Sequence, residues 1–360
     1  MSTLRDATRL LRQGGDLPPE IVPGCVDVLL DLEVGDAEKA DFLRALSDKG
    51  ETAAEAVAFV NAVLAHAVQP PLTREWNGKP LLDCCGPGGG GLSILNVSTA
   101  LVFVVVACGV PVVKHGNKGV TKKSGSSDVL EALGVRVDLG PETLPDCLEA
   151  VGAAFVFAPK YHPAFKAVGP VRMALAREGR STVFNLLGPL LNPVRPSAQL
   201  MGVFQTKQLD FYEEALSATG LPRALLVHGL AGHGDDARPL GEASPYGTNT
   251  WRQIGLEGVQ LPAHLVERRD LDIQPSRLLP EWAIEDAAHS AQRIVGFLDG
   301  TDNGPTRELV LANAAAALIA AGETRDWTEA FHRVREAVDS GAAKKVLEKW
   351  RDFSARSKAG

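Results

Sequence analysis

The chain has 360 residues, of which 45% are hydrophobic and 22% are charged, and its formal net charge is −7. This length exceeds that of a usual single domain, and the composition excludes intrinsic disorder as the main state. The net negative charge argues against a broadly basic nucleic-acid surface, although it is compatible with a local basic pocket for a phosphorylated ligand.

The cysteine pattern and the amino-terminal residues restrict the compartment. The cysteines are odd in number and contain no C-x-x-C pair; they are Cys25, Cys84, Cys85, Cys108 and Cys147. This argues against a disulfide framework or a zinc site. Residues 1–14 hold charges but no apolar block, and no apolar run reaches transmembrane length. We therefore expect a cytoplasmic chain that does not associate with a membrane.

The first part of the chain, residues 1–72, is expected to form a small helical domain. Apolar residues recur at intervals of three and four from residue 4 to residue 68, with breaks at Gly15, Gly35 and Gly50. Thr52 and Glu55 have the spacing of a capping box, which predicts the start of a helix there. Two prolines within residues 69–72 then indicate a linker.

Beyond residue 75, apolar runs of strand length alternate with helical stretches. The predicted strands are 80–84, 110–113, 135–138, 154–158, 200–204 and 224–228, and residues 305–342 are predicted to be helical. Such alternation indicates βαβ units around a mostly parallel central sheet, with ligands at the carboxyl ends of the strands. The predicted fold class is therefore α/β, with a small helical N-terminal domain followed by a larger α/β domain over residues 73–360.

A glycine-rich segment, 86–91, follows the first predicted strand and precedes a predicted helix over residues 98–108. Glycines allow backbone N–H groups to approach a phosphate closely, and a helix N-terminus adds a favourable dipole. The run from Val102 to Val106 locally favours a strand, because its side chains are β-branched or aromatic. By itself the segment fits a phosphate cradle and a simple tight connection equally well.

A basic segment, 114–128, follows the next predicted strand. It contains glycines, small hydroxyl residues and four lysines, namely Lys114, Lys118, Lys122 and Lys123. Pyrophosphate requires several charge-assisted hydrogen-bond donors, although one such loop alone is more typical of a solvated surface. Two anion-binding loops on consecutive βα units favour a pyrophosphate site.

At this point the sequence resembles a known family. Segments 86–99 and 114–134 are similar to the two signature segments of the anthranilate phosphoribosyltransferases. Residues 157–172, F-A-P-K-Y-H-P-A-F-K-A-V-G-P-V-R, and residues 184–193, F-N-L-L-G-P-L-L-N-P, resemble two further segments of that family. Residues 49–52 and 313–318 also fit, so the resemblance covers nearly the whole chain.

The resemblance implies a pentosyltransferase of tryptophan biosynthesis. The family transfers the phosphoribosyl group from 5-phosphoribosyl-1-pyrophosphate to anthranilate, giving phosphoribosylanthranilate and pyrophosphate, with Mg²⁺ as cofactor. It also implies that a helix near residues 168–179 completes the helical domain, that the active site lies between the two domains, and that the helical domain forms a homodimer. Such catalysis depends on positioning and electrostatic stabilisation, so no acid or base residue is assigned.

The site residues are carried over from the family's motifs. Those expected to bind 5-phosphoribosyl-1-pyrophosphate are Gly86, Gly88, Gly89, Asn96, Ser98, Thr99, Lys114 and Ser126. Those expected to bind the acceptor are Asn117, Arg172, His115 and His162. Arginine can pair both oxygens of a carboxylate, whereas either histidine alone is equally compatible with a structural role.

Two departures from the family concern acidic positions. The first loop normally reads G-T-G-G-D, but Pro87 and Gly90 stand at the threonine and aspartate positions here. The family also has a magnesium-binding Asp-Glu pair after a V-H-G strand, for which this chain offers two registers, Gly241-Glu242 or Asp235-Asp236. The downstream S-x-x-G-T match favours Glu242, so the predicted Mg²⁺ ligands are Ser98 and Glu242.

These departures leave two alternatives open. One is a phosphoribosyltransferase of the same fold that acts on another aromatic amine or a nucleobase. The other is a catalytically silent relative that binds nucleic acid or another polyanion through Lys114, Lys118, Lys122 and Lys123.

Overall fold

The computed structural model describes residues 4–86, 92–119, 123–265 and 275–357. Its amino-terminal part is helical, with α1 (Leu4–Arg12), α2 (Val22–Leu30), α3 (Asp36–Lys49) and α4 (Ala53–Ala65). The predicted capping box is confirmed, because Thr52 Oγ1 accepts from Glu55 N and the Glu55 carboxylate accepts from Thr52 N. Helices α1 and α3 end close to the predicted breaks at Gly15 and Gly50, whereas α2 ends at Leu30, five residues before Gly35, and α4 ends at Ala65 without a glycine.

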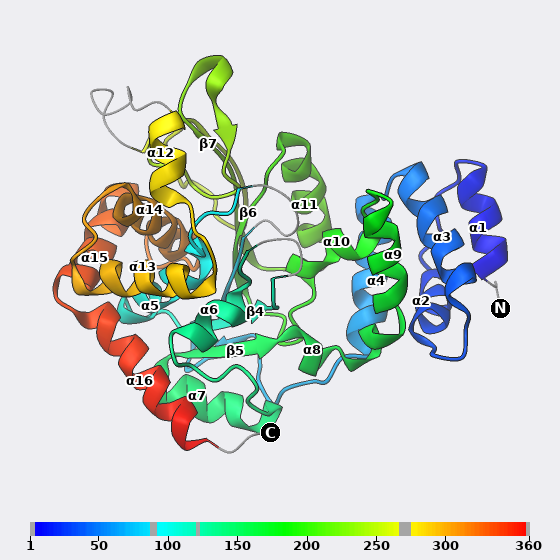
Figure 1. Ribbon diagram of the computed structural model, residues 1–360, viewed down its shortest axis with the longest axis horizontal. Coiled ribbons are helices and arrows are strands. Elements are labelled where there is room, and N and C mark those ends of the chain that lie inside the picture. Colours follow the sequence, from blue (N-terminus) through cyan, green and yellow to red (C-terminus); the bar gives the residue numbers. More distant parts are fainter. Residues whose placement is uncertain (1–3, 87–91, 120–122, 266–274, 358–360) are drawn as a thin grey trace.

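The rest of the chain surrounds a seven-stranded sheet (Figure 1). Its strands are β3 (Leu82–Cys85), β4 (Val112–Gly116), β5 (Ala153–Phe157), β6 (Ala198–Gly202), β7 (Arg223–Ala231), β8 (Arg238–Pro239) and β9 (Asn249–Ile254). The order is β5-β4-β3-β6-β7-β8, with β9 also paired to β7. Pairs from β5 to β7 are parallel, whereas β8 and β9 are antiparallel to β7. This confirms the predicted fold class. A small hairpin, β1 (Glu75–Trp76) and β2 (Lys79–Pro80), precedes the sheet.

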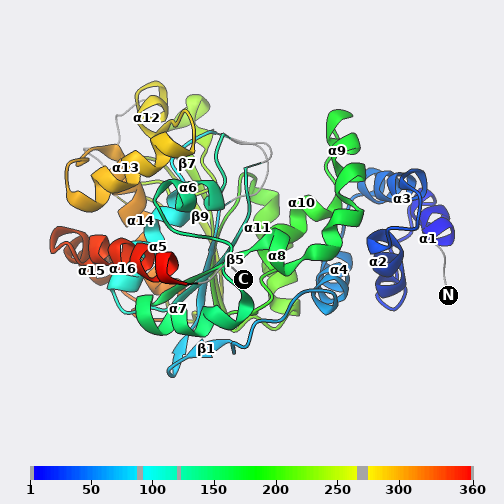
Figure 2. The same ribbon diagram turned by 60° about the horizontal axis from the view of Figure 1, so that its bottom comes forward.

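Helices cover both faces of the sheet (Figure 2). One core cluster joins the sheet to α5 (Val97–Ala107), α6 (Ser126–Ala132), α7 (Leu144–Val151), α13 (Ala287–Asp299), α14 (Pro305–Ala320), α15 (Trp327–Asp339) and α16 (Ala342–Arg356). The other cluster contains α9 (Gly169–Arg177), α10 (Val183–Leu187) and α11 (Thr206–Ala218). Two short helices, α8 (Ala158–Tyr161) and α12 (Pro275–Trp282), complete the layers. Within the described residues no helix is both long and apolar enough to span a bilayer.

The amino-terminal helices share their core with the sheet. Helix α9 packs against α3, and α4 packs against α10 and α11. The same cluster of buried side chains includes Met201 of β6 and Leu226 of β7. A continuous apolar core therefore joins the helical region to the sheet, and the boundary proposed between residues 72 and 73 stays a prediction about folding units.

Helix α5 confirms the helix predicted after the glycine-rich segment, against the local propensity of its residues. Val102, Phe103, Val104 and Val105 are all fully buried. Because α5 packs against α14 on one side and α16 on another, burial of these side chains outweighs the small penalty for β-branched residues in a helix.

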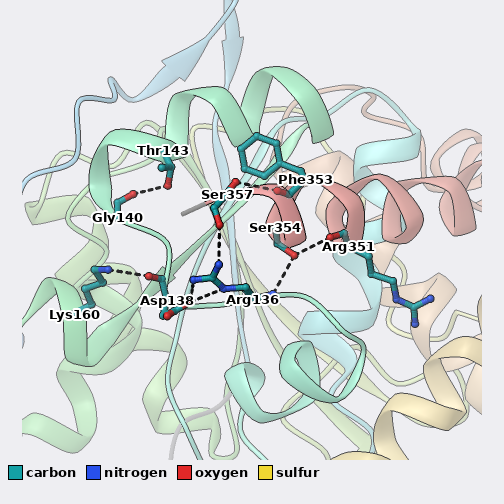
Figure 3. Close-up of polar contacts among 9 residues, drawn as sticks. All are labelled: Arg136, Asp138, Gly140, Thr143, Lys160, Arg351, Phe353, Ser354 and Ser357. Carbon is teal, nitrogen blue, oxygen red and sulfur yellow. Dashed lines mark hydrogen bonds and ion pairs between the residues drawn. The ribbon is translucent and has the colours of Figure 1, made fainter. Parts of the chain in front are cut away.

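The strand predicted at residues 135–138 is wrong. Val135 and Val137 are buried and Arg136 alternates with them, which is the pattern of a half-buried strand. However, the backbone N–H of Arg136 donates to Ser354 Oγ (3.1 Å), and its guanidinium donates to Ser357 O (2.7 Å) at the end of α16 (Figure 3). The segment is therefore fastened to a helix rather than to the sheet. Strand β9 was not predicted.

Candidate active site

Three predicted site residues meet at the carboxyl end of β3. A Cβ atom added at Gly86 would lie 3.1 Å from Glu242 Oε1 and 3.5 Å from Ser98 Oγ. The absence of a side chain at Gly86 therefore permits the carboxylate and the hydroxyl to approach this loop. These residues line a pocket together with Asn96, Lys123, Ser124 and several apolar side chains.

A buried lysine lies beside this pocket and contacts one of its lining residues, Ser98. Lys114 at the end of β4 has only 2% of its surface exposed. Its ammonium group donates to Ser98 Oγ (3.2 Å) and to the carbonyl of Cys84. Ser98 and Thr99 belong to the first turn of α5, and no partner of the buried Thr99 hydroxyl is found among the described residues. A cation and a helix N-terminus thus point to the same place, which suits an anion.

The loop that bears Glu242 is held in place by close backbone contacts. A Cβ atom at Gly202 would lie 1.7 Å from the carbonyl oxygen of Gly241, and one at Gly229 would lie 2.1 Å from that of Glu242. Asn313 fastens the loop further, since its Oδ1 accepts from Ala243 N (2.8 Å). Glu242 is buried, with 8% exposed.

The two possible registers of this loop occupy different places. Glu242 lines the pocket, whereas Asp235 and Asp236 lie in the exposed turn η4 (Gly234–Asp236) and do not line it. Gly241 has φ of +70°, a left-handed backbone conformation. Gly241, which stands at the aspartate position of the family's Asp-Glu pair, therefore has a backbone conformation that glycine adopts without steric strain.

The other residues predicted to bind 5-phosphoribosyl-1-pyrophosphate do not all lie in this pocket. Asn96 lines the pocket, but its Oδ1 accepts from Ser290 Oγ (2.9 Å) and its Nδ2 donates to Ser124 O (3.4 Å). Ser126 begins α6 and packs against the backbone of Gly116. Gly88 and Gly89, as well as Pro87 and Gly90, lie outside the described residues.

A row of rings leads away from the lysine. His115 follows Lys114 on β4, and its ring centroid is 5.4 Å from that of His162. His162 stacks on Phe165 at 5.3 Å, and Phe165 contacts Phe184 edge-on at 5.4 Å. The two phenylalanines were not predicted as site residues, although both lie in the segments that carry the family resemblance.

Both histidines are in environments that favour the neutral ring. Burial lowers the pKa of His115 to about 3, and the neighbouring His162 contributes in the same direction. Burial also lowers the pKa of His162, whose Nε2 lies 2.9 Å from the carbonyl oxygen of Leu191. The buried Nε2 of His115 has no hydrogen-bond partner among the described residues.

Arg172 of α9 ends the row. Its guanidinium carbon lies 5.4 Å from the centre of the Phe184 ring. No hydrogen bond or ion pair of this side chain is found within the described part of the chain, and burial lowers its pKa. A partly buried arginine beside aromatic rings fits the carboxylate of an aromatic acid.

The structure does not join Asn117 to this row. Asn117 is exposed, and its Oδ1 accepts from Lys118 N (2.7 Å). Its carbonyl oxygen accepts from Ser127 N (3.3 Å), so the residue closes the basic loop onto α6. Among described residues no hydrogen bond links it to Arg172 or to either histidine.

Protein atoms alone provide an incomplete metal site. Within the described ranges, no group of three or more His, Cys, Asp or Glu residues could hold a metal ion. Ser98 and Glu242 nevertheless supply a hydroxyl and a carboxylate, which are the hard oxygen donors that Mg²⁺ prefers. The donor set fits a magnesium ion whose remaining ligands are substrate oxygens and water.

The fold and pocket define a glycosyl transferase, and the family model described as "Glycosyl transferase family, a/b domain" matches residues 78–344. The anthranilate phosphoribosyltransferase of Novosphingobium aromaticivorans is 39% identical over 333 residues, covering 89% of this chain and 92% of that protein. The one from Symbiobacterium thermophilum is 35% identical and covers 98% of both chains. The chain belongs to the anthranilate phosphoribosyltransferase family.

Solved structures agree with this assignment. The crystal structure of anthranilate phosphoribosyltransferase from Thermus thermophilus has a TM-score of 0.80 at 33% identity and covers 97% of this chain and 99% of that one. The fold is also that of the Saccharomyces cerevisiae enzyme in complex with PRPP and Mg, which has a TM-score of 0.79 at 24% identity and covers 98% of each chain.

Proposed function

We propose that the protein transfers the phosphoribosyl group of 5-phosphoribosyl-1-pyrophosphate to anthranilate, with Mg²⁺ as cofactor. One observation carries the proposal: Lys114 and His115 are consecutive residues of β4 and belong to two different groups. Lys114 belongs to the phosphate side, with Gly86, Ser98 and Glu242. His115 begins the row of rings, so the two halves adjoin and can act on the same substrate pair.

On the phosphate side, the proposed role is to bind and stabilise the departing pyrophosphate. Lys114 supplies a buried positive charge, and the first turn of α5 supplies hydroxyls and the positive end of a helix dipole. Ser98 and Glu242 would hold Mg²⁺ with the pyrophosphate oxygens, where it neutralises charge that develops on the leaving group. Gly86 keeps the space between them open.

On the acceptor side, the proposed role is to orient anthranilate. The guanidinium of Arg172 would pair with the acceptor carboxylate, and the rings along Phe165 and Phe184 would contact its aromatic ring. The neutral state of His115 places no extra positive charge next to the ribose carbon, which itself becomes cationic as pyrophosphate departs. Asn117 remains a predicted acceptor contact. A similar Saccharomyces cerevisiae structure is a complex with 4-fluoroanthranilate.

Homodimer formation through the helical region is part of the proposal. Leu32 and Met173 are the large hydrophobic residues that the described structure leaves exposed, at 76% and 55%, and both lie in this region. Sedimentation velocity should show a dimer that Leu32→Arg combined with Met173→Arg converts to monomer. A monomeric wild-type protein at micromolar concentration would refute this part.

The test of activity is the loss of anthranilate fluorescence after addition of 5-phosphoribosyl-1-pyrophosphate and Mg²⁺. Omission of either, or the Lys114→Met variant, should abolish the signal change. Turnover of a nucleobase or another aromatic amine, without turnover of anthranilate, would instead support a different acceptor. DNA binding that weakens with salt and is unaccompanied by turnover would support a polyanion-binding relative. That reading has less structural support, because Lys114 is buried and Lys123 donates to the carbonyl of Ile284.

A further inference from the structure

A buried carboxylate lies in the middle of an apolar strand. Asp83 of β3 is 1% exposed, between Leu82 and Cys84, which are fully buried. Burial raises the pKa of this carboxyl group, and nearby Lys114 opposes that shift. A buried acidic side chain is costly unless it is well hydrogen-bonded, so its partners are informative. Asp83 was not among the predicted site residues, although an aspartate inside an apolar strand was a visible signal.

The partners of Asp83 are on two other segments. Its Oδ2 accepts from Asn192 Nδ2 (2.9 Å), and its Oδ1 accepts from the backbone N–H of His115 (3.2 Å). Asn192 is also buried, and its Nδ2 donates to Val113 O (3.0 Å) while its Oδ1 accepts from Val194 N (3.1 Å). The pair therefore links β3, the end of β4 and the segment that follows α10.

These side chains take the place of a backbone ladder. The register between β3 and β4 consists of one residue pair, Leu82 with Val112, whereas β4 and β5 are paired at five positions. Beyond Leu82, the side chains of Asn192 and Asp83 satisfy two groups of β4, the carbonyl of Val113 and the N–H of His115. These two groups flank Lys114 in the sequence, so the pair fixes the backbone that carries the lysine.

The pair of Asp83 and Asn192 is also connected to the acceptor side. Asn192 follows Leu191, whose carbonyl oxygen contacts His162 Nε2. Any displacement of Asn192 would therefore be transmitted to the ring of His162 as well as to β4. One buried contact thus connects the backbone positions of the phosphate side and of the row of rings.

We propose that Asp83 and Asn192 are positioning residues, which set the placement of Lys114 and of the histidine rings relative to each other. The inference rests on the function proposed above. Neither residue needs to touch a substrate: their effect is on the geometry of groups that do. Misplacement of reacting groups by about 1 Å can lower a rate by about 100-fold.

The first test uses two conservative variants and their combination. Asp83→Asn replaces one carboxylate oxygen with an NH2 group, which must then face a donor, either Asn192 Nδ2 or the backbone N–H of His115. Asn192→Ser removes the amide Nδ2 and shortens the side chain that contacts Asp83 and Val194 N. Each is expected to lower kcat/KM by about 100-fold. Residues that act as a unit have non-additive effects, so the double variant should lose no more than about 100-fold. Losses that multiply would show that the residues act independently and would overturn the proposal.

The matched control is a buried polar contact remote from the site. Ser354 is fully buried and accepts from the backbone N–H of Arg136 (Figure 3). Asp83 accepts from the backbone N–H of His115 in the same way. Ser354→Ala should lower Tm and leave kcat and both KM values unchanged. If Asp83→Asn behaved in the same way, with a lower Tm and unaltered kinetics, Asp83 would be merely structural.

A binding measurement separates this proposal from the proposed function. Calorimetry with inorganic pyrophosphate and Mg²⁺ tests the Lys114 pocket without any turnover. If the wild-type protein did not consume anthranilate, anthranilate transfer would be refuted. If both single variants nevertheless bound pyrophosphate more weakly than the wild-type protein, the positioning role would be supported. Unchanged pyrophosphate affinity together with unchanged turnover would refute the positioning role alone.

Discussion

The phosphate side and the acceptor side each contain a cationic side chain, Lys114 and Arg172, and these differ in their hydrogen-bond partners. Lys114 is almost fully buried and already donates to Ser98 and to a backbone carbonyl. Arg172 lies over the ring of Phe184, and within the described residues it has no hydrogen bond or ion pair. The first cation is held in place by other groups of the protein, whereas the second is the one that we propose to pair with the acceptor carboxylate. Substitutions on the two sides should therefore have separable effects.

Replacement of Lys114 should have the largest effect. Lys114→Met removes a buried charge that we propose acts on the pyrophosphate, and it leaves Ser98 without its donor. The pyrophosphate-binding free energy should weaken by about 3–5 kcal/mol. We expect affinity for 5-phosphoribosyl-1-pyrophosphate to fall beyond detection by calorimetry. Lys118→Ala is the control, because Lys118 is exposed and its Nζ forms only a long ion pair, 4.0 Å from Glu131 Oε2. This substitution should change the affinity for 5-phosphoribosyl-1-pyrophosphate little. Equal effects of the two would remove the distinction between the two sides.

Replacement of Arg172 should affect mainly the acceptor. Arg172→Ala removes a charged partner of the carboxylate, which corresponds to about 1.5–3 kcal/mol of acceptor binding. The KM for anthranilate should rise much more than the KM for 5-phosphoribosyl-1-pyrophosphate. Arg180→Ala, which removes an arginine paired with Asp48 at the surface, should alter neither value. A parallel rise of both KM values would place Arg172 on the phosphate side or in the fold.

Replacement of Glu242 should raise the magnesium requirement. Loss of one carboxylate ligand is expected to raise the magnesium concentration for half-maximal activity by about tenfold. Asp236→Ala is the internal control, because Asp236 is exposed and does not line the pocket. A harmless Glu242→Ala with a disabling Asp236→Ala would reverse the register. Gly241→Asp restores the aspartate that the family has at this position and should lower the magnesium requirement. The left-handed backbone of Gly241 should make this decrease smaller, because an aspartate is strained there.

The smallest effect concerns pH and stability on the acceptor side. Burial lowers the pKa of His115 from 6.5 to about 3, so the folded protein binds fewer protons than the unfolded chain between these values. The free energy of unfolding should therefore be highest above pH 6.5 and should decrease as pH falls toward 3. His115→Gln should reduce this decrease in urea titrations at several pH values. An identical pH dependence in both proteins would show that His115 ionises as freely in the folded state as in the unfolded one.

Much of the fold could be predicted from local sequence patterns. Glycine breaks and the Thr52 capping box located the amino-terminal helices, because helix ends depend on residues within one turn. The glycine-rich and basic segments directly followed apolar runs, which indicated two loops on consecutive βα units. The site residues on these loops came mainly from family motifs, and the structure places Gly86, Ser98 and Lys114 together.

Other features depended on contacts between distant segments. Residues 135–138 have a strand pattern, but only α16 decides where the hydrogen-bonding groups of Arg136 go. Helix α5 forms from residues that locally favour strands, because packing against α14, α15 and α16 buries them.

The site divides in the same way between sequence and tertiary structure. The sequence by itself predicted two anion-binding loops, since such a loop is built from neighbouring residues of one strand, loop and helix. Only the tertiary structure decided the row of rings and the contact of Asp83 with Asn192, 109 positions apart. Ring stacking and buried side-chain hydrogen bonds join surfaces whose separation in sequence has no regular period. No local pattern of apolar and polar residues can therefore specify them.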